Sequence, residues 1–506
     1  MRIARLAAAA LLMVASAGYA SDLRSSVQAY RQSHEMQILG QLDDLTRIDS
    51  VAANPSGLQA AANRLQVELK ARGFETRQLS ASAGPPAVFA QLITPGARRT
   101  VVFYAHYDGQ PVTPSQWATP PFAPAMRSGT LAAGAPVVDW KSVQGPLDPE
   151  WRLYARAASD DKSSIVSFLA GFDALKASGH KPGINIKVLW EGEEEANSPH
   201  LGEILSANKA LLASDLWLIG DGPVHQTRRQ QIYFGARGNT SLEMTFYGPL
   251  RPLHSGHYGN WAPNPAVMAA EVITRMRDDE GRILIPGFSD DVRPLTAAET
   301  ASIAALPPVE GDLKREFAIG RSEGEEGLTA STMRPAINIR GFRSGGVGTE
   351  VTNSIPAEAV VSVDFRLVPG QTPDSVRRKV DRFLSAQGWT LTEQTPDLAT
   401  RLAHPRIIRM NWEGGYRALR TDMTTAVSKA VIATASKAAG EPVAVLPMMG
   451  GSVPIYLFDD IFAAPVIGLP VANHDNNQHA PNENLRLKNL WDGVVLYAEM
   501  IGELRW

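Results

Sequence analysis

Residues 184–195 read Ile-Asn-Ile-Lys-Val-Leu-Trp-Glu-Gly-Glu-Glu-Glu, an apolar run that ends abruptly in a group of carboxylates. The run predicts a buried β-strand over residues 184–190. A run of charges more often marks a solvated face. Here, however, the acids sit at the tip of an apolar strand, where they repel one another unless a cation or a shared proton holds them. The stretch therefore predicts a strand of an α/β sheet with a ligand site at its end.

The neighbouring sequence repeats the alternation of strand and helix. Residues 57–73 and 163–177 carry apolar side chains at helical spacing. Residues 88–93, 100–104 and 216–219 are short apolar runs typical of strands. Strands that alternate with helices predict an α/β domain with a mixed, largely parallel sheet flanked by helices.

The pattern changes near residue 236. Residues 241–247 alternate strictly between apolar and polar side chains, as a half-exposed strand does. Further predicted elements are helices at 263–277 and 373–386 and strands at 336–339, 359–367 and 390–393, with a Pro- and Gly-rich polar stretch over 280–330. This β-α-β-β-α-β order is that of a ferredoxin-like α+β module inserted into the first domain. The first domain then resumes with a helix at 421–437 and a strand at 464–468.

The first residues form a predicted signal peptide, residues 1–20. Arg2 and Arg5 precede the apolar stretch 6–14, and Gly18 and Ala20 offer small residues to a signal peptidase. We therefore expect an exported, periplasmic or secreted chain that has no membrane segment after cleavage; a retained anchor is the alternative. Cysteine is absent, so any metal ligands must be His, Asp or Glu. The net charge of −3 gives no indication of a nucleic-acid partner.

Polar residues gather at the ends of these predicted elements. Each has a plainer interpretation, such as a helix cap, a turn or a surface histidine. As an ordered set, they supply the nitrogen and oxygen donors that two zinc ions and an activated water require. The residues are His106 and Asp108, Asp160 and Asp161, the acids of 191–195, Asp221 between two glycines, and His479.

In these motifs, across about residues 35–500, the chain resembles the dizinc metallopeptidases typified by carnosinase, aminoacylase, succinyl-diaminopimelate desuccinylase and carboxypeptidase G. The resemblance implies a catalytic domain formed by residues 21–236 and 411–506, with a lid or dimerisation domain at 237–410. It also implies two Zn²⁺ ions, with Co²⁺ or Mn²⁺ as alternatives, and a homodimer formed through the lid.

The resemblance assigns a role to each residue of the set. It implies that Glu194 is the general base and that Asp108 orients His106. It implies that Asp160 bridges the two metals and that the Asp160–Asp161 peptide bond is cis. The implied metal ligands are His106, Asp160 and Asp221 for one ion, and Asp160, Glu195 and His479 for the other.

The implied substrate-binding residues come from the lid and from a glycine-rich loop. His254 reaches the scissile carbonyl in the partner's active site, and Arg366 binds a substrate carboxylate, for which a guanidinium is well suited. Asn353 also reaches the substrate. Gly450, Gly451 and Ser452 bring their backbone close to it.

The expected activity is hydrolysis of the amide bond of dipeptides or short peptides with a free C-terminus. Family members with Asp at the position of Asp221 tend to be dipeptidases or aminopeptidases, whereas Glu there is typical of deacylases and carboxypeptidases. An N-acyl-amino-acid deacylase or a carboxypeptidase on the same scaffold is the alternative. A non-catalytic binding protein is disfavoured, because no ligand and no base is missing.

Overall fold

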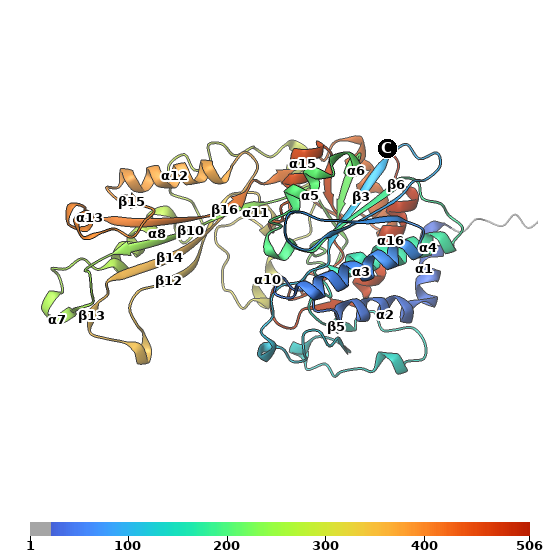
Figure 1. Cartoon of the computed structure of the whole chain (residues 1–506), viewed down its shortest axis with the longest axis horizontal. Coiled ribbons are helices and arrows are strands. Elements are labelled where there is room, and N and C mark those ends of the chain that lie inside the picture. Colours follow the sequence, from blue (N-terminus) through green and yellow to red (C-terminus); the bar gives the residue numbers. More distant parts are fainter. Residues whose placement is uncertain (1–21) are drawn as a thin grey trace, which may run out of the picture.

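Two β-sheets organise the chain, as the computed structural model of residues 22–506 shows (Figure 1). The predicted signal peptide lies outside the described residues. The α-helices are α1 (Leu23–Ser33), α2 (Glu35–Thr46), α3 (Pro55–Ala71), α4 (Lys162–Ala177), α5 (Leu201–Ala207), α6 (Lys209–Leu212), α7 (Ser255–Tyr258), α8 (Pro265–Met276), α9 (Ala297–Ala304), α10 (Glu310–Glu316), α11 (Leu328–Thr332), α12 (Pro373–Ala386), α13 (Leu398–Ala403), α14 (Ala426–Ala439), α15 (Tyr456–Phe462) and α16 (Leu487–Glu503).

The larger sheet, here called the main sheet, has eight strands. Their order is β1 (Glu75–Leu79), β2 (Ala87–Leu92), β6 (Asn185–Glu191), β3 (Thr100–His106), β7 (Leu216–Ile219), β19 (Val466–Gly468), β8 (Gln231–Tyr233) and β18 (Ala444–Leu446). Its central strands β6, β3, β7 and β19 run parallel, and antiparallel pairings lie on either side of them. The predicted mixed, largely parallel sheet is confirmed.

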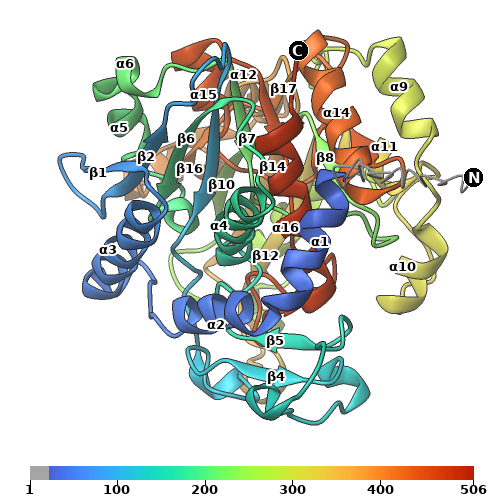
Figure 2. The ribbon, with the colours of Figure 1, turned by 90° about the vertical axis from the view of Figure 1, so that its right-hand side faces the viewer.

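Helices cover both faces of the main sheet, and its central strands β3, β6 and β7 are buried along almost their whole length. From β3, Val101 and Phe103 join the hydrophobic cluster formed with α4 and α16, whereas Val102 and Tyr104 join the cluster beneath α5 and α15. Figure 2 shows α4, α16 and α1 packed over the first of these faces. The strands are therefore held from both sides, and their ends are fixed in position.

The smaller sheet, here called the lid sheet, has five strands that project away from the main sheet (Figure 1). Their order is β12 (Ala336–Arg343), β14 (Glu358–Leu367), β10 (Gly238–Tyr247), β16 (Ile407–Tyr416) and β15 (Thr390–Thr392). Alternate residues of β10 pack against α8 and α12 in one cluster, as the strict alternation of residues 241–247 predicts.

The ferredoxin-like order has an additional strand. β16 pairs antiparallel with β10 and parallel with β15, and so separates the two strands that the predicted module would have placed side by side. The period-two pattern of Ile408, Met410 and Trp412 is visible in the sequence, but the predicted domain limit at residue 410 cuts through it. The predicted domain limits stay a prediction.

The polar stretch 280–330 also contains more structure than was predicted. It forms α9, α10 and α11, which return from the lid to the main part of the molecule (Figure 1). Three small sheets complete the fold: β11 (Leu253–His254) with β13 (Ser354–Ile355), β17 (Leu419–Arg420) with β9 (Gly235–Ala236), and β20 (Asn484–Arg486), β5 (Arg152–Tyr154) and β4 (Ala125–Arg127). Within residues 22–506, no helix has the length and apolar character needed to cross a membrane.

Candidate metal centre and substrate cleft

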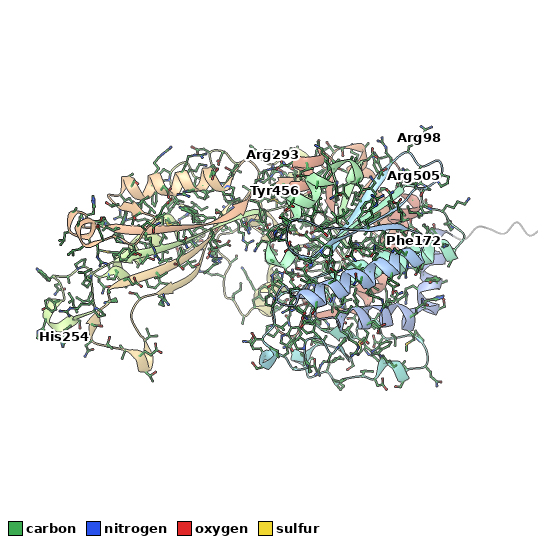
Figure 3. The ribbon with its side chains drawn as sticks, viewed as in Figure 1. Arg98, Phe172, His254, Arg293, Tyr456 and Arg505 are labelled. Carbon is green, nitrogen blue, oxygen red and sulfur yellow. The ribbon has the colours of Figure 1, made fainter. Side chains whose placement is uncertain are left out.

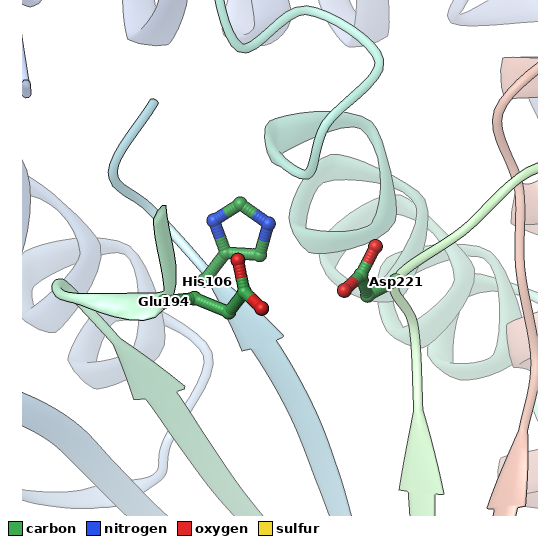
Figure 4. A group of neighbouring side chains, drawn as sticks. All are labelled: His106, Glu194 and Asp221. Carbon is green, nitrogen blue, oxygen red and sulfur yellow. The ribbon is translucent and has the colours of Figure 1, made fainter. Parts of the chain in front are cut away.

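Three neighbouring strands of the main sheet end at the same edge and bring polar side chains together. His106 is the last residue of β3 and pairs with Glu191, the last residue of β6. Glu194 lies in the turn that follows β6, and Asp221 follows β7 on the other side of β3. Figure 4 shows His106, Glu194 and Asp221 converging from these three strand ends.

Asp160 lies between the two predicted histidine ligands. One of its carboxylate oxygens is 3.1 Å from Nε2 of His106, and the other is 3.2 Å from Nε2 of His479. The same His479 nitrogen is 3.2 Å from Oε2 of Glu195. Asp160 precedes α4, and its peptide bond to Asp161 is cis, as the resemblance implies.

The donors form two groups that could each hold a metal ion. One contains His106, Glu194 and Asp221, and the other contains Asp160, Glu195 and His479; within each group the ligand atoms lie within 4.8 Å of one another. Imidazole nitrogens and carboxylate oxygens are the donors that zinc and similar divalent ions accept. All five predicted ligands and the predicted base therefore lie together, and their composition fits such ions.

Electrostatics at this edge also favour a cation. Burial, and then the neighbouring Asp160, raise the pKa of Asp221 to about 7, and burial raises the pKa of Glu194 well above its usual value. Hydrogen bonds to Asp160 and Glu195 raise the pKa of His479 to about 11. The carboxylates of this cluster therefore require positive charge close to them, which divalent ions would supply when bound.

Asp108 connects the two groups. Its Oδ1 is 3.2 Å from Nδ1 of His106, and its Oδ2 accepts a 3.0 Å hydrogen bond from the backbone N–H of Glu195. A carboxylate at Nδ1 fixes which imidazole nitrogen is free to bind a metal. The orienting position expected for Asp108 is therefore the one that it occupies.

Glu483 was not among the predicted residues, yet it shapes the Asp160 loop. This fully buried carboxylate accepts hydrogen bonds from the backbone N–H groups of Ala157 (2.9 Å), Ser159 (2.9 Å) and Asp160 (3.0 Å), and it also bonds Arg156. Glu483 lies four residues after His479. The same segment therefore supplies one predicted ligand, His479, and the carboxylate that holds the backbone of another, Asp160. An acid near the histidine is visible in the sequence, but its partners more than 300 residues away are not.

Gln110 is a second residue that was not predicted. Its side-chain amide donates a 2.6 Å hydrogen bond to Oε2 of Glu195, the same oxygen that faces His479. The amide therefore orients this carboxylate within the second donor group. The sequence signal is weak, because Gln110 differs from any polar loop residue only by its position four residues after His106.

The metal groups open into a cleft of about 450 Å³. Arg366, from the end of β14, lines this cleft together with Gly450, Gly451 and Ser452. Its Nη1 donates to Oγ of Ser452 at 2.8 Å, and its Nε donates to Asp364 at 2.9 Å. Leu328, Thr329 and Thr332 of α11 form another part of the lining. The α11 residues were not among the predicted site residues; they lie at the end of the Pro- and Gly-rich polar stretch, for which no element was predicted.

His254 and Asn353 are not brought to this cleft within the same chain. They lie side by side where β11 meets β13, and the backbone N–H of Ser255 donates to the carbonyl of Asn353 at 2.9 Å. Figure 3 shows His254 at the end of the lid that is farthest from the main sheet. One chain alone therefore places these two residues away from the metal groups.

Comparisons with known proteins agree with this architecture. The "Cys-Gly metallodipeptidase dug1" of Schizosaccharomyces pombe is 25% identical over 427 residues, which is 83% of this chain and 83% of that protein. The "Beta-Ala-His dipeptidase" of Homo sapiens is 26% identical over 436 residues, which is 83% of this chain and 78% of that protein.

Solved structures share the fold over nearly the whole chain. An M20 family metallo-carboxypeptidase from Sulfolobus solfataricus matches with a TM-score of 0.74 and 27% identity, covering 92% of this chain and 98% of that one. Human carnosine dipeptidase 1 matches with a TM-score of 0.75 and 21% identity, covering 96% and 99%. Residues 102–503 match the description "Peptidase family M20/M25/M40", and the chain belongs to this family of peptidases.

Proposed function

We propose that this protein is a dizinc dipeptidase that hydrolyses the amide bond of dipeptides with a free C-terminus. The observation that carries the proposal is the arrangement, around one cleft, of two donor groups that include Glu194, and of an arginine, Arg366. The names of its relatives as Cys-Gly and β-Ala-His dipeptidases support a dipeptide substrate over an acylated amino acid. Asp at position 221 supports the same choice.

The proposed metal ligands follow from the donor groups. His106, Asp160 and Asp221 would hold one ion, and Asp160, Glu195 and His479 would hold the other, with Asp160 shared because its two oxygens face different histidines. Zinc suits this mixture of nitrogen and oxygen donors, and cobalt or manganese could replace it. When bound, divalent ions lower the pKa of a water molecule and polarise the substrate carbonyl.

The protein side chains would move the proton and hold the substrate. Glu194 would take the proton from the attacking water and pass it to the leaving amine, as a general base that then acts as a general acid. Arg366 would hold the C-terminal carboxylate through charge-assisted hydrogen bonds. Gly450 and Gly451, having no side chains, leave room for the substrate against the backbone, and Ser452 keeps Arg366 in place.

We also propose that the active protein is a homodimer formed through the lid. His254 and Asn353 lie far from the metal groups of their own chain, so they could serve only the site of a second copy. The lid also carries exposed apolar side chains near His254: Trp261 is 79% exposed, and Val267 and Leu250 are also exposed. Apolar patches of this kind are typical of interfaces between subunits.

The first prediction concerns the substrate class. Purified protein loaded with zinc, cobalt or manganese should hydrolyse free dipeptides such as Cys-Gly or Ala-Ala. N-acetyl and N-succinyl amino acids should react at least about tenfold more slowly, since a 1.4 kcal/mol difference in transition-state stabilisation already gives that ratio. Amine release measured by chromatography provides the comparison. Preferential hydrolysis of the acylated amino acids would identify a deacylase instead.

The second prediction separates the base from its neighbouring ligand. Glu194→Gln should keep two zinc ions per chain, by elemental analysis, but lose turnover by about 10²–10⁴-fold, because only proton transfer is removed. Glu195→Gln is the matched control one residue away. It should lose metal, since an amide is a poorer ligand than a carboxylate. If the metal loss followed Glu194 instead, the assigned roles of these two residues would be reversed.

The third prediction tests whether His254 of one subunit acts in the active site of the other. His254→Ala and Glu194→Gln should each be inactive as pure proteins. After subunit exchange in a 1:1 mixture, activity should recover to about a quarter of the wild-type value, because half of the dimers are mixed and each mixed dimer has one intact site. Exchange is followed with differently tagged subunits. Proven exchange without recovery, or a fully active monomer in sedimentation, would contradict the dimeric arrangement.

The fourth prediction concerns export. We propose that residues 1–20 direct secretion and are removed after Ala20. Expression of the full chain in a bacterium should give a protein in the periplasm or medium whose N-terminal sequencing begins at Ser21. Arg2→Glu combined with Arg5→Glu should retain the precursor in the cytoplasm. Cytoplasmic protein that keeps residues 1–20 in both cases would contradict the proposal.

A further inference from the structure

A second arginine lies beside Arg366, buried where the chain passes from β9 into β10. Arg237 is only 7% exposed. Its backbone N–H donates to the carbonyl of Gly451 at 3.1 Å. Its Nη2 donates to the backbone carbonyl of Arg334 at 3.0 Å, just beyond α11. Arg237 therefore connects two segments of the substrate cleft, the glycine-rich loop and the α11 wall.

The guanidinium of Arg237 is incompletely paired. Its Nε is buried and has no hydrogen-bond partner among the described residues, and Arg237 forms no ion pair within residues 22–506. Burial, together with repulsion from Arg366, lowers its pKa to about 10, so the group stays charged near neutral pH. Attraction to Asp364 opposes this lowering of the pKa only in part. A buried cation without an ion pair is costly unless it has another function or gains a counter-ion.

The charge of Arg237 lies next to the proposed carboxylate-binding group. Arg237 directly precedes β10, whose Asn239 pairs with Arg366 of β14. The charges of Arg366 and Asp364 both act on the pKa of Arg237, so the three side chains lie close together. Asp364 accepts a hydrogen bond from Nε of Arg366. Two guanidinium groups and one carboxylate thus leave an excess positive charge at the corner of the cleft that Arg366 lines.

The helix α11, which lies next to the hydrogen bond of Arg237, forms one wall of the substrate cleft. Thr332 of α11 and Gly450 both line the cleft, and a Cβ added at Gly450 would lie 3.2 Å from Cγ2 of Thr332. Met333, the next residue, is buried against Val368 and Met448. Movement of Arg237 would therefore shift both the α11 wall and the loop that contacts Arg366.

We infer that Arg237 is a positioning residue for recognition of the substrate's C-terminal carboxylate, supplying the second positive charge of that corner and fixing α11 and the glycine-rich loop around Arg366. The inference rests on the proposed dipeptidase function. It assigns Arg237 no contact with the reacting atoms. Its consequence is selectivity: the corner should favour a negatively charged substrate end over a neutral one.

The test compares Ala-Ala with its C-terminal amide, Ala-Ala-NH₂, on the zinc-loaded full-length protein. Arg237→Met removes the charge and keeps most of the side-chain volume. It should raise KM for Ala-Ala at least tenfold while kcat changes less than about threefold, and KM for the amide should change less than about threefold. Arg237→Lys, which keeps the charge, should stay within about threefold of the wild type for the ratio of the two KM values.

Arg293→Met is a matched control, because Arg293 also donates to a backbone carbonyl, that of Arg420. Its backbone hydrogen bonds join it to Pro369 and Arg420 rather than to the glycine-rich loop or the segment after α11. This variant should leave the ratio of the two KM values unchanged. Equal losses on both substrates, or the same effect in Arg293→Met, would show a merely structural role and overturn the inference. If Arg237→Met does not fold, Arg237→Lys decides: a tenfold loss of selectivity despite the retained charge would also overturn it. Wild-type protein that hydrolyses neither peptide would instead refute the proposed function itself.

Discussion

Repulsion among closely spaced carboxylates, buried or half-buried, is the constraint on which the rest of the structure depends. Asp160, Glu194, Glu195 and Asp221 lie at one edge of the main sheet, with only two imidazoles to balance them. Such a cluster is stable only if the surrounding chain holds each acid in place and a cation compensates the charge. The parallel strands β6, β3 and β7, packed by helices on both faces, provide rigid points of attachment. Glu483, Asp108 and Gln110 then fix individual oxygens and backbone N–H groups.

Charge is distributed unequally along the cleft. The metal end is rich in carboxylates and would be neutralised by divalent ions, whereas the other end is lined by Arg366, with Arg237 buried close to it. A dipeptide carries the opposite order: an amino group at one end, a neutral amide in the middle and a carboxylate at the other end. In the proposed mode of binding, this match would orient the substrate before any chemistry takes place, and it would place the amide near Glu194 without requiring a large side-chain pocket.

The sequence alone was sufficient to predict those features that depend on a local pattern of residues. Apolar runs that end in His106, Glu191 and Asp221 could be recognised as strands, and the edge of a parallel sheet then brought their ends together. What could not be predicted depends on contacts between distant segments. Glu483 holds the loop before Asp160 from more than 300 residues away, and Arg237 bonds the carbonyl of Arg334, 97 residues further along the chain and just after α11. The strand β16 was missed for a different reason, because its alternating pattern was divided by a domain limit placed at residue 410.

The small pair of β9 and β17 joins the two halves of the molecule where the chain enters and leaves the lid. Gly235 and Ala236 lead into the lid sheet, Leu419 and Arg420 lead out of it, and the two segments are hydrogen-bonded to each other as an antiparallel ribbon. Entry and exit are therefore fixed to each other, although more than 180 residues of chain separate them. The lid is thus an insertion whose two ends start from one point, so its length can change without disturbing the strands that carry the metal groups.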